Sequence, residues 1–251
     1  MKKKTAKQIV GILGLGEVGR AIKKVCQKHY RVFTKDLTHN NLKGKKVDIL
    51  HICIPFLSWP KFSRPVVFQI TTNSPKLVII DSTVAPGTTR KIEKQSKTPT
   101  VHAPMMGVHP RLYDYFFVFP KVIGPVSEKG KRLALKHFKT LDLKTIIFKK
   151  AEETEAAKLF STTYYGLAIG FCKWLKKYCD KKNLNFENVY TKFNRIYNKG
   201  YQKSLPYVRR PVLIPMPGKI GGHCVLENAK ILKKKISDPF SKLILKLNET
   251  F

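Results

Sequence analysis

The chain has 251 residues, enough for one large or two small domains with a buried core. It carries 49 Lys and Arg residues against 16 Asp and Glu residues, a formal net charge of +33, with the apolar content of an ordinary globular protein. No run approaches the roughly 18 apolar residues of a membrane span, so we expect a chain without one.

The charge leaves two interpretations open. One is a polyanionic partner such as nucleic acid, anionic lipid or an acidic glycan; the other is a solvated, lysine-rich surface. Because the basic residues are mostly lysines spread along the whole chain, the second is favoured and a nucleic-acid partner is not. Either surface would attract anionic substrates.

The cysteines and the N-terminus both indicate a cytoplasmic protein. Five cysteines form no CxxC pair and are odd in number, which favours a reducing compartment over disulfides. The start resembles a signal peptide, but its short apolar run is explained as a strand and a glycine turn, so we expect no targeting segment. The cysteines are Cys26, Cys53, Cys172, Cys179 and Cys224.

A glycine-rich turn is the first informative feature of the chain. Residues 7–13 are typical of a buried strand, residues 14–19 (GLGEVG) match G-x-G-x-x-G, and residues 20–28 are typical of a helix. The first glycine makes a tight turn, the second lets a pyrophosphate approach the backbone, and the third allows close helix–strand packing. The sequence predicts a dinucleotide-binding turn; the alternative is a turn that serves packing alone.

An acidic residue follows at the expected spacing. Asp36 ends the second predicted strand, about 20 residues beyond the turn, where such an acid binds ribose hydroxyls. Its carboxylate would repel the 2′-phosphate of NADP, although Arg31 and Lys35 lie close to it. We therefore expect NAD as the cofactor, and no metal site.

The rest of the first half alternates strands and helices. Residues 37–46 are fewer than the dozen or so of a helical crossover, so the domain is compressed there. After a strand at 77–80, residues 81–89 place hydroxyls and a Pro-Gly turn where open α/β sheets bind ligands. The other expected strands are 47–54 (which Pro55 ends), 100–102, 121–124 and 144–148, and the expected helices lie within 56–72, 88–94 and 128–140.

From residue 152 the pattern changes to helices. Glutamates crowd the start of a long helix and lysines its end, as the helix dipole favours, with an apolar stripe between them. Further helices are expected over 185–198, from 224 to 232 and from 238, with a proline-rich loop over 205–220. The predicted fold is therefore α/β: a Rossmann-type, doubly wound, mostly parallel sheet at 1–150, then a smaller all-helical domain at 151–251 for substrate binding and dimerisation.

Four separated segments carry a more specific signal. They are 12–20 (ILGLGEVGR), 81–89 (DSTVAPGTT), 151–170 (AEETEAAKLFSTTYYGLAIG) and 218–224 (GKIGGHC). In order and spacing they resemble the nucleotide-sugar dehydrogenase family, which includes the UDP-glucose and UDP-N-acetylmannosamine dehydrogenases. The first segment is generic to dehydrogenases, whereas the second and fourth together are fairly specific.

The resemblance implies NAD-dependent oxidation of a sugar or nucleotide-sugar alcohol. In this family a cysteine captures the intermediate aldehyde as a thiohemiacetal, and a second oxidation gives a thioester that water hydrolyses. By motif, Cys224 is the nucleophile and Lys158 the active-site lysine, while Thr162 stands where the family usually has Asn and Thr83 lies near the nicotinamide. The residues expected to bind the cofactor are Gly14, Gly16, Glu17, Val18, Gly19, Asp36, Pro55, Ser82 and Thr83.

Each catalytic assignment has a structural alternative. Cys224 could serve as a small buried apolar residue and Lys158 as a solvated lysine on a helix surface. Thr83 could serve only as a hydroxyl that forms a turn. Met105 stands where the family has a glutamate for acid–base work, and methionine cannot move a proton. His109 is near enough to substitute, although a histidine beside a proline is more often structural.

Three functions remain open. The first is a compact nucleotide-sugar dehydrogenase, which we expect to lack the family's C-terminal nucleotide-sugar-binding domain. The second is a 6-phosphogluconate or β-hydroxyacid type of dehydrogenase, in which Cys224 is incidental. The third is a non-catalytic NAD-binding subunit that needs a partner. By resemblance to the family's long central helix, a homodimer is expected.

Overall fold

The computed structural model describes residues 7–220 and 223–251. The chain forms two compact units, residues 1–159 and 160–251, which are treated separately below. The boundary falls inside helix α6 (Ala151–Lys181), so this helix begins in the first unit and continues into the second.

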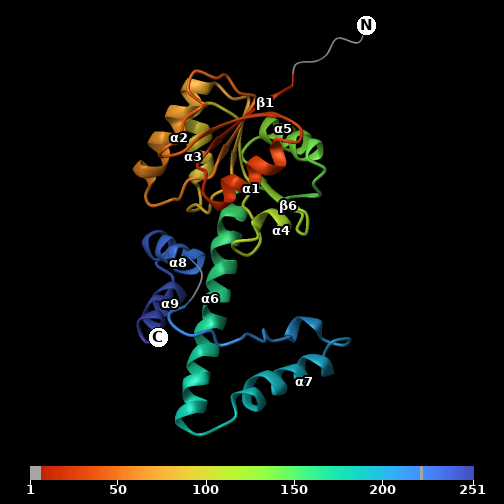
Figure 1. The fold of residues 1–251 in the computed structure, drawn as a ribbon, viewed down its shortest axis with the longest axis vertical. Coiled ribbons are helices and arrows are strands. Elements are labelled where there is room, and N and C mark those ends of the chain that lie inside the picture. The colour runs from red at the N-terminus through yellow and green to blue at the C-terminus, as the bar shows by residue number, and fades with distance from the viewer. Residues whose placement is uncertain (1–6, 221–222) are drawn as a thin grey trace. The chain divides into compact units, whose positions relative to one another are not determined.

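The first unit is built on a seven-stranded sheet with the order β2-β1-β3-β4-β5-β6-β7 (Figure 1). Neighbouring strands are parallel except β5 and β6. Because β2 and β3 lie on opposite sides of β1, the strand order reverses at β1, and ligands of open α/β sheets bind beyond the carboxyl ends at such a point. The strands are β1 (Ile9–Leu13), β2 (Arg31–Lys35), β3 (Ile49–Ile52), β4 (Leu77–Ile80), β5 (Thr100–His102), β6 (Lys121–Pro125) and β7 (Thr145–Ile147).

Helices cover both faces of this sheet (Figure 1). Strands β3 and β4 are buried throughout, and alternate side chains point to opposite faces. Ile49 and Ile79 share one core with residues of α1 and α5, such as Ile22 and Phe138. The helices are α1 (Glu17–Cys26), α2 (Trp59–Asn73), α3 (Thr88–Ser96), the short α4 (Leu112–Tyr115) and α5 (Glu128–Thr140).

The compressed crossover is present as expected. Residues 37–46 connect β2 to β3 through turns, without a helix. The buried Asn73 side chain donates hydrogen bonds to the carbonyls of Leu42 and Lys45 at 2.9 and 2.6 Å, and the Leu42 side chain is fully buried. These contacts replace the packing that a crossover helix would supply.

The second unit is helical. Beyond its part of α6 it contains a π-helix (Glu187–Lys192), α7 (Phe193–Gly200), a 3₁₀ turn (Pro206–Val208), α8 (His223–Lys235) and α9 (Pro239–Glu249). Helix α8 packs closely on α6, because a Cβ added at Gly166 would lie 2.5 Å from Val225 Cγ1. Asp238 caps α9 by accepting a hydrogen bond from the Ser241 amide at 2.7 Å.

The predicted fold class is confirmed: a mostly parallel, doubly wound sheet is followed by helices, with a long helix at its start. Within residues 7–220 and 223–251, no helix combines the length and apolar character that crossing a bilayer requires.

Candidate dinucleotide and thiol sites

The turn between β1 and α1 contains two glycines at which any side chain would clash with the backbone of the folded chain. Gly14 has φ of +96°, and a Cβ there would lie 2.9 Å from the carbonyl carbon and oxygen of Cys53. A Cβ at Gly19 would lie 1.9 Å from the Gly14 oxygen. Packing alone therefore explains these two positions.

Gly16 has no such explanation. A Cβ at Gly16 would meet no described atom within 4 Å, and its φ of −59° suits any residue. The residue lies at the N-terminus of α1, whose amide groups and dipole favour a negatively charged group. The open space beside Gly16 is thus the feature that fits a pyrophosphate approaching the backbone.

The other expected cofactor residues lie at the carboxyl edge of the same sheet. Asp36 follows β2, and its amide donates a hydrogen bond to the His39 carbonyl at 2.7 Å. Pro55 is exposed beyond β3, and the Ser82 hydroxyl beyond β4 donates to the Ile54 carbonyl at 2.7 Å. Ser82 therefore joins the ends of β3 and β4, and Thr83 follows it, half-buried.

Val18 and Glu17 occupy different surroundings in the glycine turn. Val18 packs against the core of the first unit. Glu17 forms an ion pair with the exposed His109, while its Oε1 is buried without a hydrogen-bond partner in the described part of the chain. His109 thus contacts the start of α1, the helix that follows β1.

A buried glutamate, not singled out from the sequence, holds the 81–89 loop. Glu155 on α6 accepts hydrogen bonds from the amides of Gly87 and Thr89 at 2.6 and 2.8 Å, and from the Thr89 hydroxyl at 2.6 Å. These amides begin helix α3, so the carboxylate caps that helix from outside. In the sequence Glu155 is one of three acids at a helix start, and its spacing gave no sign of this role.

Burial gives Glu155 a pH-dependent effect on stability. Burial raises its pKa from 4.5 to about 7, and although the three hydrogen bonds lower the pKa, nearby Glu152 raises it. Between pH 4.5 and 7 the folded chain therefore holds a proton that the unfolded chain has lost, and stability falls as pH rises. We expect the stability of the wild type relative to Glu155→Gln to fall by roughly 2–3 kcal/mol from pH 4.5 to pH 8.

Urea unfolding of both proteins at the two pH values measures this difference. Comparing wild type with variant cancels the titration of other carboxyls, such as Asp48 and Glu152, whose pKa values are lowered by their ion pairs. An unchanged difference between pH 4.5 and pH 8 would contradict the assignment.

A second buried residue supports the same loop. His102 lies under it, with Nδ1 2.8 Å from the Thr154 hydroxyl and Nε2 3.1 Å from the Ser82 carbonyl. Burial lowers its pKa to about 3, so the imidazole is neutral at physiological pH. His102 therefore supports the loop as a neutral hydrogen-bonding group.

Lys158 contacts Met105, the residue at the position where a glutamate was expected. Its ammonium donates to the Met105 carbonyl at 2.7 Å. The Met105 side chain is buried in the core, where its sulfur lies 3.5 Å from Lys121 Nζ. Met105 therefore fills the core and places a backbone carbonyl, rather than a carboxylate, beside Lys158.

The second unit brings Thr162 and the Cys224 helix together. The buried Asn228 of α8 donates a hydrogen bond to the Thr162 hydroxyl of α6 at 2.8 Å. Asn228 is four residues beyond the half-buried Cys224, so both lie on one face of α8. An amide thus stands beside the threonine that replaces the family's Asn. Asn228 was not singled out from the sequence, where its i, i+4 spacing from Cys224 is the one signal that points to it. Gly221 and Gly222 of the cysteine motif lie outside the described residues.

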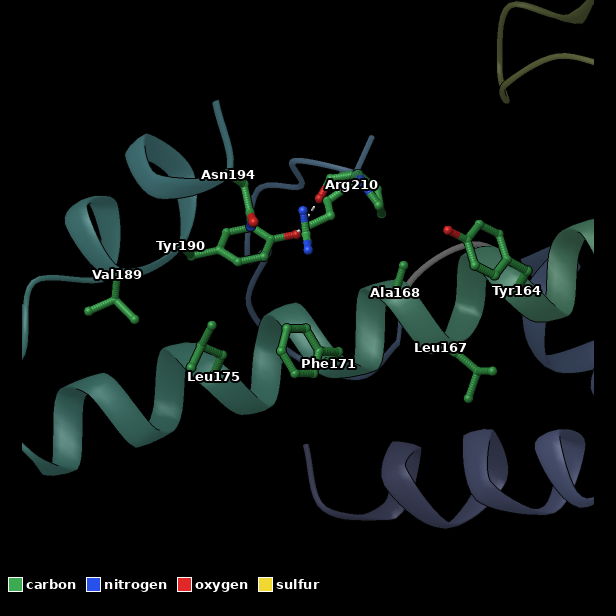
Figure 2. A pocket seen from close by; sticks show the side chains of 10 residues that line it. Tyr164, Leu167, Ala168, Phe171, Leu175, Val189, Tyr190, Asn194 and Arg210 are labelled. Atoms are coloured by element: carbon green, nitrogen blue, oxygen red, sulfur yellow. Dashed lines mark hydrogen bonds between the residues drawn. The ribbon is translucent and has the colours of Figure 1, made fainter. Parts of the chain in front are cut away.

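The second unit also carries an apolar groove of about 480 Å³ (Figure 2). Leu167, Phe171 and Leu175 of α6 line one side, and the π-helix supplies Val189 and Tyr190 opposite them. The Tyr190 hydroxyl donates to the Pro211 carbonyl at 2.9 Å, which fixes the loop over this groove.

The chain has a Rossmann-type sheet with an open glycine turn at its switch point, followed by a long helix packed against a cysteine-bearing helix. This architecture is that of a Rossmann-type α/β protein with a helical second unit.

Proteins of known function are similar to this chain in sequence and in structure. A UDP-N-acetyl-D-mannosamine dehydrogenase of Methanocaldococcus jannaschii is 24% identical over 242 residues, which cover 85% of this chain and 54% of the relative. A UDP-D-ManNAc dehydrogenase of Pyrococcus horikoshii matches the structure with a TM-score of 0.76 and 18% identity, over 96% of this chain and 68% of that one. The resemblance seen in the motifs is confirmed: homologues of this chain are nucleotide-sugar dehydrogenases.

The chain matches only part of its nucleotide-sugar dehydrogenase relatives, and it also resembles a shorter dehydrogenase. The chain spans about half the length of the M. jannaschii relative, and no protein-family model matches it. A 3-hydroxyisobutyrate dehydrogenase of Mycobacterium tuberculosis shares the fold with a TM-score of 0.70 and 13% identity, over 97% of this chain and 93% of that one.

Proposed function

We propose that this chain is an NAD-dependent dehydrogenase that oxidises the alcohol of a nucleotide sugar and captures the aldehyde on Cys224. The observation that carries the proposal is its sequence similarity, over 85% of its length, to a UDP-N-acetyl-D-mannosamine dehydrogenase. The open turn at Gly16 and the contact between Thr162 and the Cys224 helix support the cofactor and thiol parts respectively.

The residues of the first unit fit NAD. The space beside Gly16 would admit the pyrophosphate, the α1 amides would bind its charge, and Asp36 would accept hydrogen bonds from the ribose hydroxyls. Ser82 and Thr83 lie beyond β4, on the nicotinamide side of such a site. When bound, NAD would accept the hydride in each oxidation.

The chain's own residues would perform the remaining steps. Lys158 stabilises the alkoxide as the alcohol releases its proton to solvent, and loss of a hydride from that alkoxide leaves an aldehyde. The Cys224 thiolate adds to the aldehyde carbon, and the oxygen takes up a proton to give a thiohemiacetal. Loss of that proton and a second hydride yields a thioester, whose hydrolysis by water releases a carboxylic acid and restores the thiol.

Met105 makes the last step the slow one in this proposal. Hydrolysis requires a group that accepts a proton from water, and the core-packed Met105 offers none. His109 is held in its ion pair with Glu17, so we assign it no part in hydrolysis.

A β-hydroxyacid dehydrogenase is the second candidate. The M. tuberculosis 3-hydroxyisobutyrate dehydrogenase is matched over 93% of its length, whereas the P. horikoshii nucleotide-sugar enzyme is matched over 68%. In this candidate Lys158 acts as the base and Cys224 has no catalytic role. Turnover of a hydroxyacid by Cys224→Ser would favour it.

We propose a cytoplasmic homodimer as the working form. The second half of α6 exposes aromatic side chains that an apolar partner surface would cover; these are Phe171, Trp174 and Tyr178, each more than 40% exposed. A basic surface that attracts anionic nucleotide sugars accounts for the net charge without a nucleic-acid partner. If the protein binds NAD but oxidises nothing, the remaining candidate is a non-catalytic subunit.

A thermal-shift series with NAD, NADP and nucleotide sugars tests the cofactor assignment. We expect NAD to raise the melting temperature more than NADP, because a ligand bound only by the folded state stabilises it. Asp36→Ser should weaken NAD binding by about tenfold and reduce the preference over NADP, since the carboxylate no longer binds the ribose or repels a 2′-phosphate. A preference for NADP in the wild type would contradict the assignment.

A further inference from the structure

A chain of buried polar side chains crosses one face of the sheet in the first unit. Lys121 Nζ lies 2.9 Å from Asp81 Oδ1, and Asp81 Oδ2 lies 2.7 Å from His51 Nδ1. His51 Nε2 faces His137 Nε2 at 3.1 Å, and His137 Nδ1 lies 3.0 Å from the Tyr30 hydroxyl. All five side chains are buried, and neither the dinucleotide site nor the thiol site uses them.

Both histidines lie close to a buried cysteine, Cys26. Cys26, the last residue of α1, is fully buried, and its sulfur and one nitrogen of each histidine all lie within 4.8 Å of one another. Strand β3 supplies His51 and helix α5 supplies His137. The fold thus brings together one thiol and two imidazoles from residues that are far apart in the sequence. For this reason the sequence shows no metal-binding motif at these positions.

We propose that Cys26, His51 and His137 bind a transition-metal ion of the thiolate- and imidazole-preferring class, Zn²⁺ or Cu⁺. Tetrahedral zinc, with bonds of about 2.0–2.3 Å, places neighbouring ligand atoms roughly 3.3–3.6 Å apart. The 3.1 Å between the two Nε2 atoms is close to that spacing, and the cysteine sulfur, within 4.8 Å of a nitrogen of each histidine, would move closer to complete the site.

The groups behind the histidines match those of metal sites. A ligating histidine usually hydrogen-bonds its other nitrogen to a carboxylate, carbonyl or hydroxyl, which fixes the ring and its tautomer. His51 has Asp81 in that place and His137 has Tyr30, so both rings present Nε2 to the same point.

The charges are also compatible with a cation. Binding converts the Cys26 thiol to a thiolate and releases its proton to solvent, so one negative charge faces the ion directly. Asp81 adds a second negative charge behind His51, and the ammonium of Lys121, which is ion-paired with Asp81, offsets that charge.

Metal analysis of the purified protein tests the proposal. Expressed with added Zn²⁺ or Cu⁺ and freed of loosely bound ions by dialysis, the wild type should retain about one ion per chain. Because the site is buried, a second sample is unfolded with a chelator and refolded with Co²⁺. Refolding should produce a sulfur-to-cobalt charge-transfer band together with the visible bands of tetrahedral cobalt.

Three variants make the result specific. Cys26→Ser should lose the charge-transfer band and most of the metal, whereas Cys179→Ser, a buried cysteine on α6, should lose neither. Tyr30→Phe keeps all three ligands but removes the hydroxyl behind His137, so it should weaken metal affinity about 10–100-fold. This variant keeps the test valid if Cys26→Ser fails to fold.

Two outcomes would overturn the proposal. One is a folded wild type that holds no stoichiometric metal after expression with zinc or copper and after refolding with cobalt. The other is metal retained equally by Cys26→Ser and the wild type, since the ion would then lie elsewhere. Retention of zinc rather than copper, or the reverse, identifies the ion.

Discussion

Replacing Cys224 with serine is expected to abolish aldehyde oxidation while leaving NAD binding intact. A serine hydroxyl is a much weaker nucleophile than a thiolate, so the covalent adduct that precedes the second oxidation no longer forms. We expect the rate of aldehyde oxidation to fall by roughly a thousandfold or more. Cys224 lies in the second unit, so the melting-temperature shift caused by NAD should not change.

The matched control is Cys172→Ser, which alters another cysteine of the second unit. Cys172 is buried and donates a weak hydrogen bond to the Leu213 carbonyl, 3.6 Å from its sulfur. A nucleophilic role for Cys224 requires the control to retain aldehyde oxidation. Turnover of a hydroxyacid by Cys224→Ser would instead favour the β-hydroxyacid candidate.

Gly16→Ala is expected to weaken NAD binding at least about tenfold with little loss of stability. The new Cβ meets no described atom of the folded protein, and alanine adopts the observed φ without strain. The residue precedes the first turn of α1, where alanine is a poorer cap than glycine, so a cost of about 1 kcal/mol or less is expected. The methyl group would occupy the space assigned to the pyrophosphate, so NAD affinity should fall at least about tenfold.

Gly19→Ala provides the contrast within the same turn. Its Cβ would lie 1.9 Å from the Gly14 oxygen, so helix and strand must separate, and we expect a loss of several kcal/mol of stability. Urea unfolding and NAD titration of the two variants separate ligand space from packing. If Gly16→Ala bound NAD as tightly as the wild type, the open space would not be the pyrophosphate site.

Much of the first unit could be predicted from the sequence. Strands β3 and β4 are continuous apolar runs because both faces are covered, and such runs are visible without a structure. The bounds of β4, β5 and α5 agree with the prediction. Asp81 follows the apolar run of β4, and Ser127 caps the start of α5, so both boundaries are visible in the sequence. Helix α4 was not predicted, since four residues give no helical period.

The supporting residues of the site could not be predicted in the same way. Glu155 reaches Gly87 and Thr89 across more than 60 positions of sequence, and its acidic neighbours gave it the appearance of a helix-dipole residue. The polar chain through His51 and Asp81 likewise depends on strand order, which local patterns do not encode. Sequence motifs located the loops to which we assign ligand binding, whereas tertiary contacts decide what holds those loops.

The number of NADH molecules formed per nucleotide sugar tests the proposed function most directly. With UDP-N-acetylmannosamine or UDP-glucose as substrate, the wild type should form about two NADH per sugar consumed, because alcohol and thiohemiacetal each lose one hydride. Cys224→Ser should form no more than about one, since the aldehyde is not captured. A wild type that binds NAD but forms no NADH with any nucleotide sugar would contradict the account.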